Sequence, residues 1–197
     1  MSSKIDTGFG RCGTRFFGSR PGLTPDLLVV GKALGNGLPI SAVLGDPALL
    51  DALPSGAHSS TFAGHPLACA AGAEVVDAML ETRPWRLARE AGSTLRDSLA
   101  ALAATVPGVG PPRGEGLLVA FDCLDGSGRP SAAAARAFAA AALRAGVVLR
   151  HGGWSGSTVK LSPPLLLEDG EVSFLTEALR AAAERATPAR EEAHALL

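Results

Sequence analysis

Lys32 is the residue of this chain whose position most clearly suggests chemistry. It follows the apolar run at 27–30 and opens a glycine-rich segment, KALGNGLP, and the chain has only two other lysines, Lys4 and Lys160. A lysine at the carboxyl end of a buried strand points into the crevice where open α/β sheets bind ligands. Partial burial there would disfavour the ammonium form and leave the nucleophilic amine that carbonyl chemistry needs. The alternative is a lysine whose stem packs while its head reaches water, and spacing alone favours neither.

The segment SSTFAGHPLACAA, residues 59–71, is the second candidate. The hydroxyls of Ser59, Ser60 and Thr61 precede Pro66, which suits the first turn of a helix because its missing N–H costs nothing there. Hydroxyls beside the free N–H groups of a helix start suit a phosphate, whereas ordinary helix capping is the better explanation of this segment alone. Together with a carbonyl-seeking lysine, the economical explanation is pyridoxal phosphate, which carries both an aldehyde and a phosphate.

Other motifs are weaker. GFGRCG at 8–13 fits the dinucleotide fingerprint, but only a few polar residues precede it, and the segment TRFFGSRPG behind it indicates a loop rather than a helix. Gly31-Lys32 lacks the flanking residues of a phosphate loop. The four histidines lie too far apart to form a zinc motif, so we expect no metal. Cys69 is expected to be a small core residue.

The composition narrows the class of protein. Apolar residues make up 47% of the 197 residues and the formal net charge is −1, which indicates a soluble globular protein without the basic surface that nucleic acid requires. No apolar run approaches the roughly 20 residues of a membrane span. The first residues, MSSKIDTGFGRCG, lack the apolar core of a secretory signal. The three cysteines show neither an even number for pairing nor metal-ligand spacing, which suits a reducing compartment. We therefore expect a cytoplasmic protein.

The pattern of apolar residues predicts an α/β fold. Strands are expected at 27–31, 41–45, 117–123, 147–150 and 158–162, and helices at 47–53, 66–82, 85–104, 131–145 and 169–185. The strands at 27–31 and 41–45 are continuous apolar runs, which indicates burial on both faces. The helix at 66–82 is apolar on most faces, which indicates that it is enclosed. We place a domain boundary at Pro84, which separates residues 1–83 from 84–197.

Five segments carry a resemblance to a known family. TGFGRCG, PDLLVVGKALGNGLPISAVLG and SSTFAGHPLACAA, in that order, closely resemble class III pyridoxal-phosphate aminotransferases, which include the acetylornithine, ornithine and 4-aminobutyrate enzymes. RGEGLL (113–118) and TVKLSPPLLLEDGEV (158–172) resemble the C-terminal domain of that family. The resemblance covers nearly the whole chain but only the C-terminal half of the longer family members. It implies that 1–83 belong to a large cofactor-binding domain with a mainly parallel sheet, and 84–197 to a small α/β domain.

The resemblance also implies roles for particular residues. Lys32 would form a Schiff base with pyridoxal 5'-phosphate and then shuttle the proton, while Ser60 and Thr61 would reach across a homodimer interface to the partner's cofactor phosphate. Lys160 stands where the family usually has an arginine that binds a substrate carboxylate, so it keeps the charge and loses the planar fork. The implied reaction transfers an amino group between an amino-acid or amine donor and a 2-oxo acid.

The sequence departs from the family pattern at the cofactor ring. The matched half lacks the family's glycine-rich phosphate turn and ring-stacking aromatic residue. By alignment on Thr7, Ser3 replaces the aspartate that pairs with the pyridine nitrogen, and Asp6 occupies a glutamine-like position.

Three hypotheses about the function of the chain stay open. The chain could be the C-terminal part of an aminotransferase, from a truncated gene model or a split gene. It could carry out other pyridoxal-phosphate chemistry, as an aminomutase or racemase. It could also be a non-catalytic remnant.

Overall fold

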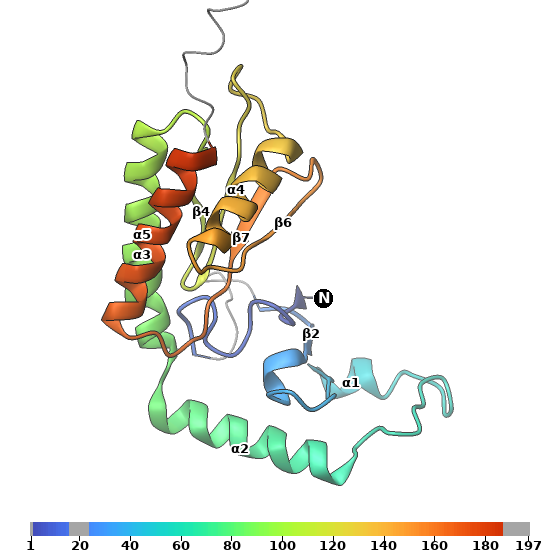
Figure 1. Cartoon of the computed structure of the whole chain (residues 1–197). Coiled ribbons are helices and arrows are strands. Elements are labelled where there is room, and N and C mark those ends of the chain that lie inside the picture. The colour runs from blue at the N-terminus through green and yellow to red at the C-terminus, as the bar shows by residue number, and fades with distance from the viewer. Residues whose placement is uncertain (1, 16–23, 187–197) are drawn as a thin grey trace, which may run out of the picture. The chain divides into compact units, whose positions relative to one another are not determined.

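The computed structural model describes residues 2–15 and 24–186, and the chain divides into two compact units, Met1–Ala88 and Arg89–Leu197 (Figure 1). Helices and strands alternate in both, which confirms the predicted α/β class. Most of the loop expected at 14–22 lies outside the described residues. The assignment of 1–83 and 84–197 to the two domains of the family stays a prediction.

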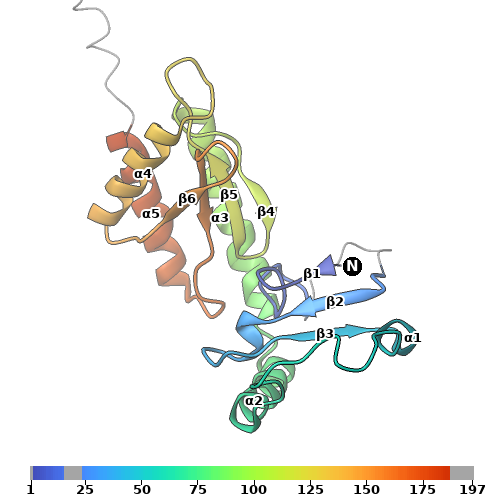
Figure 2. The same cartoon turned by 90° about the vertical axis from the view of Figure 1, so that its right-hand side faces the viewer.

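The first unit is built on a small sheet in the order β1-β2-β3 (Figure 2). Its strands are β1 (Ser2–Ser3), β2 (Leu27–Val30) and β3 (Ala42–Gly45). β1 runs parallel to β2 and β3 runs antiparallel to it, so the pairing within these described strands is mixed. The strands expected at 27–31 and 41–45 are confirmed. β1 was not predicted because two serines carry no apolar signal.

The sheet is less buried than its sequence indicates. Val30 is only 2% exposed, but the rest of β2 is half-buried, and Val43 and Leu44 of β3 are exposed. The prediction that both strands are covered on both faces is therefore wrong for the part of the chain that the structure describes. A continuous apolar run indicates that a strand is buried on both faces in its complete environment. The described residues form only part of that environment.

Two helices follow the sheet. α1 (Pro47–Leu50) is capped by Asp46, whose carboxylate accepts a 2.8 Å hydrogen bond from the Ala48 N–H. α2 (Pro66–Thr82) begins at Pro66 and spans the predicted 66–82. The prediction that α2 is enclosed is wrong among the described residues, because only three of its residues are buried: Ala68, Gly72 and Met79. Leu67 on the same helix is 64% exposed.

A compact core joins the loop at 8–13 to β2 and α2. Phe9, Val30 and Met79 are buried at its centre, and the partly buried residues that pack against them are Leu28, Leu34, Ala42, Val75, Val76 and Trp85. Gly10 lies at φ +85 with its backbone close to Trp85, a place where a side chain would be strained. GFGRCG is therefore a core-forming loop in this structure, and the dinucleotide interpretation is not supported.

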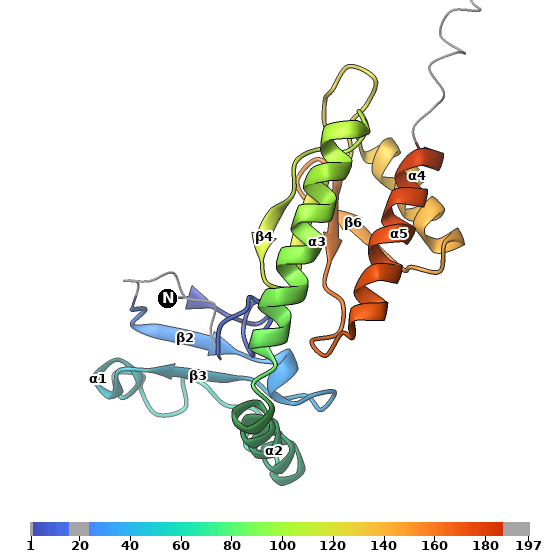
Figure 3. The same cartoon turned by 90° about the vertical axis from the view of Figure 1, so that its left-hand side faces the viewer.

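The second unit has a four-stranded antiparallel sheet in the order β4-β5-β7-β6, accompanied by three helices (Figure 3). Its elements are α3 (Trp85–Thr105, which begins in the first unit), β4 (Arg113–Glu115), β5 (Leu118–Asp122), α4 (Ala132–Arg144), β6 (Arg150–Gly152), β7 (Thr158–Leu161) and α5 (Asp169–Ala186). Most of these elements were predicted at nearly these positions, but β6 shares only Arg150 with the strand expected at 147–150, and β4 was not predicted. β4 lies in a glycine- and proline-rich stretch, a composition that is typical of a loop between elements.

Alternation along the strands separates the two faces of this sheet. Val119 and Phe121 of β5 are fully buried, as is Val159 of β7, and Phe121 meets Phe138 of α4 edge-to-face at 5.2 Å. The residues between them, including Ala120 and Lys160, therefore lie on the opposite face. That opposite face carries the polar residues of the unit that are considered below.

Candidate active site

Lys32 follows β2 on a strained turn. It is the first residue of the short 3₁₀ turn η1 (Lys32–Leu34) and has φ +46, a left-handed conformation that is uncommon for residues other than glycine. The turn is closed by a 3.1 Å hydrogen bond from the Leu34 N–H to the Gly31 carbonyl. Leu34 in turn packs against Gly72 of α2, which fixes the turn on the helix. The lysine is thus held by backbone geometry rather than by packing of its own side chain.

The amine of Lys32 forms an ion pair with the Asp6 carboxylate, and the Lys32 side chain is 64% exposed. Of the two interpretations of this lysine, the described residues agree with the one in which its head reaches water. The sequence indicated a buried strand before Lys32, but the covering layer that would bury its side chain is not formed by the described residues. What the structure presents is an accessible amine with a carboxylate beside it.

Strand pairing explains why Asp6 and Lys32 meet. Ser3 on β1 lies opposite Val29 on β2 in parallel register, and the Lys4 N–H extends the pairing with a 2.8 Å hydrogen bond to the Val29 carbonyl. Asp6 and Lys32 therefore both follow the carboxyl ends of neighbouring parallel strands, which is the edge where α/β sheets bind ligands. Sequence analysis singled out each residue but could not pair them, because the pairing depends on the unpredicted strand β1.

An open hollow of about 450 Å³ adjoins Lys32. Its lining residues all come from one segment: Lys32, Ala33, Asn36, Gly37, Leu38 and Pro39. A ligand cavity normally encloses most of its ligand between several elements. This hollow, lined by one segment, therefore does not by itself enclose a ligand.

Ser60 and Thr61 are exposed, and among the described residues neither hydroxyl forms a hydrogen bond. The N-cap of α2 is His65, which makes no side-chain capping bond, so these hydroxyls do not cap the helix. The capping explanation of this segment is therefore wrong in this structure. The hydroxyls are available to a ligand or a partner.

Lys160 belongs to β7 in the second unit, where its side chain is exposed. It lies directly opposite Ala120 of β5 on one side and Arg150 of β6 on the other. Lys32 lies in the first unit, so the expectation that the two lysines share a cavity stays a prediction.

Arg113 of the RGEGLL segment makes the main charged cluster of the second unit. Its guanidinium donates hydrogen bonds of 2.8 and 3.1 Å to the two carboxylate oxygens of Asp122 and one of 3.1 Å to Thr158 Oγ1. These bonds, with those donated by Thr158 and Ser157, hold the pKa of Asp122 below its ordinary value although partial burial opposes this. Sequence analysis singled out the segment that contains Arg113 but could not predict its hydrogen-bond partners. Thr158 comes close to Arg113 only through strand pairing.

None of the three cysteines, all of which lie in the described part of the chain, forms a disulfide. Cys69 is exposed, so the prediction that it is a core residue is wrong, because α2 is not enclosed by the described residues. Cys123 is buried, and burial first, then the nearby charge of Asp122, raises the pKa of its thiol to about 12. A thiol so rarely ionised is unsuited to nucleophilic chemistry.

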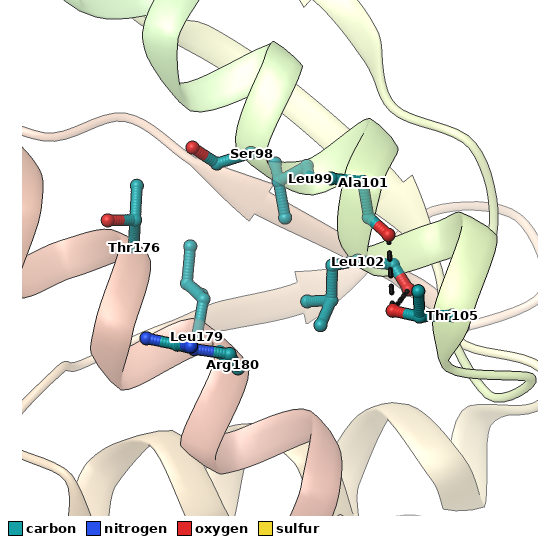
Figure 4. A pocket seen from close by; sticks show the side chains of 8 residues that line it. All are labelled: Ser98, Leu99, Ala101, Leu102, Thr105, Thr176, Leu179 and Arg180. Atoms are coloured by element: carbon teal, nitrogen blue, oxygen red, sulfur yellow. Dashed lines mark hydrogen bonds between the residues drawn. The ribbon is translucent and has the colours of Figure 1, made fainter.

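A second hollow, of about 330 Å³, lies between α3 and α5 (Figure 4). Its lining residues are Ser98, Leu99, Ala101, Leu102, Thr105, Thr176, Leu179 and Arg180. The three leucines are nearly fully buried, and Thr105 Oγ1 is already bonded to the carbonyls of Ala101 and Leu102 at 3.1 and 3.2 Å. None of the predicted site residues lines this hollow.

Within residues 2–15 and 24–186, no group of three or more histidine, cysteine, aspartate or glutamate side chains is placed to hold a metal ion. The helices of the same residues include none that combines the length and the apolar character needed to cross a membrane.

Comparison with known proteins identifies the family. The model of the class-III aminotransferase family matches residues 3–183. The diaminobutyrate–2-oxoglutarate aminotransferase of Rhizobium meliloti (strain 1021) is 37% identical over 190 residues, which cover 92% of this chain and 40% of that protein. The 4-aminobutyrate aminotransferase GabT of Escherichia coli (strain K12) is 30% identical over 87% of this chain and 41% of its own length. The chain belongs to the class-III aminotransferases, which depend on pyridoxal phosphate, and the recognition from sequence is confirmed.

A solved structure agrees with this assignment. The ornithine aminotransferase from Toxoplasma gondii, crystallised in the presence of oxidised glutathione and described with partial occupancy of pyridoxal phosphate at its active site, matches with a TM-score of 0.82. The identity is 30%, over 92% of this chain and 42% of that one. The chain thus spans about 40% of the length of the relatives that it matches.

Proposed function

We propose that this chain supplies the carboxyl-terminal part of a site for pyridoxal-phosphate-dependent amino transfer, from an amino-acid or amine donor to a 2-oxo acid. The observation that carries the proposal is the accessible amine of Lys32, held at φ +46 beside Asp6 at the edge of the sheet. Strained backbone of this kind persists where function requires a fixed side-chain position. The 2-oxoglutarate in the name of the Rhizobium relative is our first choice of acceptor.

The described residues fit one end of the cofactor. Lys32 offers a primary amine for the aldehyde carbon, and the hollow at 32–39 forms a wall beside that amine. Ser3, aligned with the aspartate that pairs with the ring nitrogen in the family, carries no charge. The acidic residue nearest to Ser3 in the sequence is Asp6, which is engaged with Lys32. The ring end therefore depends on groups beyond this wall.

The chemistry of the chain centres on Lys32 Nζ. When bound, the cofactor supplies an electrophilic aldehyde and takes up the electron pair released at the substrate carbon. Lys32 Nζ reacts with an aldehyde as the neutral amine, so its ion pair with Asp6 has to open before the reaction. We assign the proton transfer at the substrate carbon to the same Nζ atom, with Asp6 orienting it.

Ser60 and Thr61 are assigned to the cofactor phosphate of a partner subunit in a homodimer. Their free hydroxyls and their place before the N-terminus of α2 support this role, because such positions suit phosphate oxygens. Exposed large apolar side chains occur throughout the surrounding segment, at Val43, Leu44, Leu49, Leu53, Phe62 and Leu67. Apolar exposure of this extent is typical of a surface that another protein surface covers.

Lys160 is assigned to a substrate carboxylate, on the basis of its exposed position on β7 and its charge.

Location of the protein in the cytoplasm is part of the same proposal. It is supported by the three cysteines, none of which forms a disulfide among the described residues, since disulfides are rare in reducing compartments.

The test is a transamination assay with 2-oxoglutarate and several amine donors. We expect no appreciable turnover by the chain alone, because its described residues form one wall of the site. We expect turnover when the chain is mixed with the amino-terminal portion of the Rhizobium relative, and its loss with Lys32→Ala but not with Arg136→Ala, an exposed control on α4. Turnover by the chain alone, an inactive mixture, or activity that survives Lys32→Ala would each contradict the proposal.

A further inference from the structure

Arg150 and Lys160 lie directly opposite each other on the antiparallel strands β6 and β7. Residues so paired carry their Cβ atoms about 4.5–5.5 Å apart on the same face of the sheet. Both side chains are exposed. Like charges directly opposite each other destabilise a strand pair, so this arrangement has a cost unless an anion lies between them.

The neighbouring strands show that the pair lacks a counter-charge. The register forms one row across the sheet, in which Arg113 lies opposite Ala120, Ala120 opposite Lys160, and Lys160 opposite Arg150. Arg113 is neutralised by its two hydrogen bonds to Asp122. Lys160 and Arg150 form no ion pair with any described residue. The row therefore contains one satisfied cation and two adjacent cations that are free to bind an anion.

The chemistry of the two side chains indicates which anion they suit. A guanidinium donates two parallel hydrogen bonds that match the two oxygens of a carboxylate, whereas an ammonium acts as a point charge. Ala120, on the other side of Lys160, has a small side chain and leaves the face open there. β6 is an edge strand, so a small molecule can reach Arg150 from solvent.

We propose that Arg150 and Lys160 together bind one carboxylate of the 2-oxo acid or amino-acid substrate, with Arg150 supplying the planar fork that Lys160 lacks. This inference rests on the proposed function, which it deepens by adding Arg150 as a specificity-determining residue. Lys160 attracts and orients the carboxylate, and Arg150 fixes its plane. The pair predicts a preference for substrates that carry a carboxylate over neutral amines and ketones.

The inference is tested by arginine footprinting of the whole chain without cofactor. Phenylglyoxal modifies accessible guanidinium groups, and peptide mass spectrometry gives the rate at each arginine. With 2-oxoglutarate at about 10 mM we expect modification of Arg150 to slow about threefold, while Arg136 on α4 is unaffected, because a bidentate carboxylate shields the guanidinium. Sodium chloride at the same ionic strength serves as the control for screening.

Variants at Lys160 complete the experiment. Lys160→Ala should abolish the protection of Arg150, Lys160→Arg should keep it, and Arg144→Ala, which removes a charge elsewhere in the same unit, should leave it unchanged. Equal rates at Arg150 with and without 2-oxoglutarate, equal protection at Arg136, or full protection in Lys160→Ala would each overturn the inference. Because the assay involves neither Lys32 nor the cofactor, its failure is distinguishable from failure of the proposed function.

Discussion

Asp6 and Lys32 form an ion pair just beyond the carboxyl ends of two neighbouring parallel strands. Neither residue is buried, so the ion pair itself adds little to stability. Its significance is positional, since β1 and β2 bring a carboxylate and an amine together at the edge where α/β sheets bind ligands.

The backbone of Lys32 gives a prediction about stability. At φ +46 an alanine is strained and a glycine is not, so Lys32→Gly should be more stable than Lys32→Ala by roughly 0.5–1 kcal/mol in urea unfolding. The matched control is Lys160, which lies in the extended strand β7, where glycine should be less stable than alanine. A Lys32→Gly variant less stable than Lys32→Ala would contradict the left-handed turn.

Gly92 of α3 explains part of the RGEGLL motif. A Cβ atom at Gly92 would overlap the carbonyl oxygen of Gly116, so the helix approaches the β4-β5 turn at backbone distance. We expect Gly92→Ala to lower the free energy of unfolding by about 3 kcal/mol. Gly126→Ala, with nothing near its Cβ position, should change it by less than about 0.5 kcal/mol. Equal effects of the two changes in urea unfolding would refute this close packing.

The Arg113–Asp122 cluster gives a prediction about pH. The pKa of Asp122 in the folded chain lies below its ordinary value of about 3.9, chiefly because of the hydrogen bonds from Arg113. Its contribution to stability is therefore present above that ordinary value and is lost as pH falls through the folded pKa. Asp122→Asn should weaken the acid dependence of the unfolding midpoint, while Glu177→Gln, an exposed carboxylate of α5, should not. Identical acid profiles for the wild type and Asp122→Asn would disprove this role.

The exposed apolar side chains of the first unit predict association. Leu67 is 64% exposed on α2, and we expect the chain to self-associate in sedimentation velocity because such surface is unfavourable in water. Leu67→Ser should weaken that association measurably. Leu166→Ser, at an equally exposed leucine (61%) of the second unit, is the control and should have a smaller effect. A monomeric wild type would argue against this apolar segment as a subunit interface.

Local signals in the sequence were sufficient to predict where most helices and strands lie. They were insufficient to predict how deeply each element is buried and what it pairs with. Pro66 and the apolar spacing located α2, and the pattern of apolar residues located β5 and β7, because these signals act within a few residues. The burial of β2 and α2 was overestimated, since apolar patterning reports the complete environment of a segment. Pairings such as Asp6–Lys32 could not be foreseen, because they depend on strand register.

Borohydride trapping tests the central claim most directly. The chain is incubated with pyridoxal phosphate and borohydride, which makes the attachment of an aldehyde to a lysine amine permanent, and the labelled peptides are mapped. The account predicts weak but selective labelling at Lys32, above that at Lys4 and Lys160, and stronger labelling once the amino-terminal portion of the Rhizobium relative is added. In Lys32→Ala the selective label should disappear. Equal labelling of all three lysines, or a labelled peptide that lacks Lys32, would contradict the assignment of Lys32 as the cofactor-binding amine.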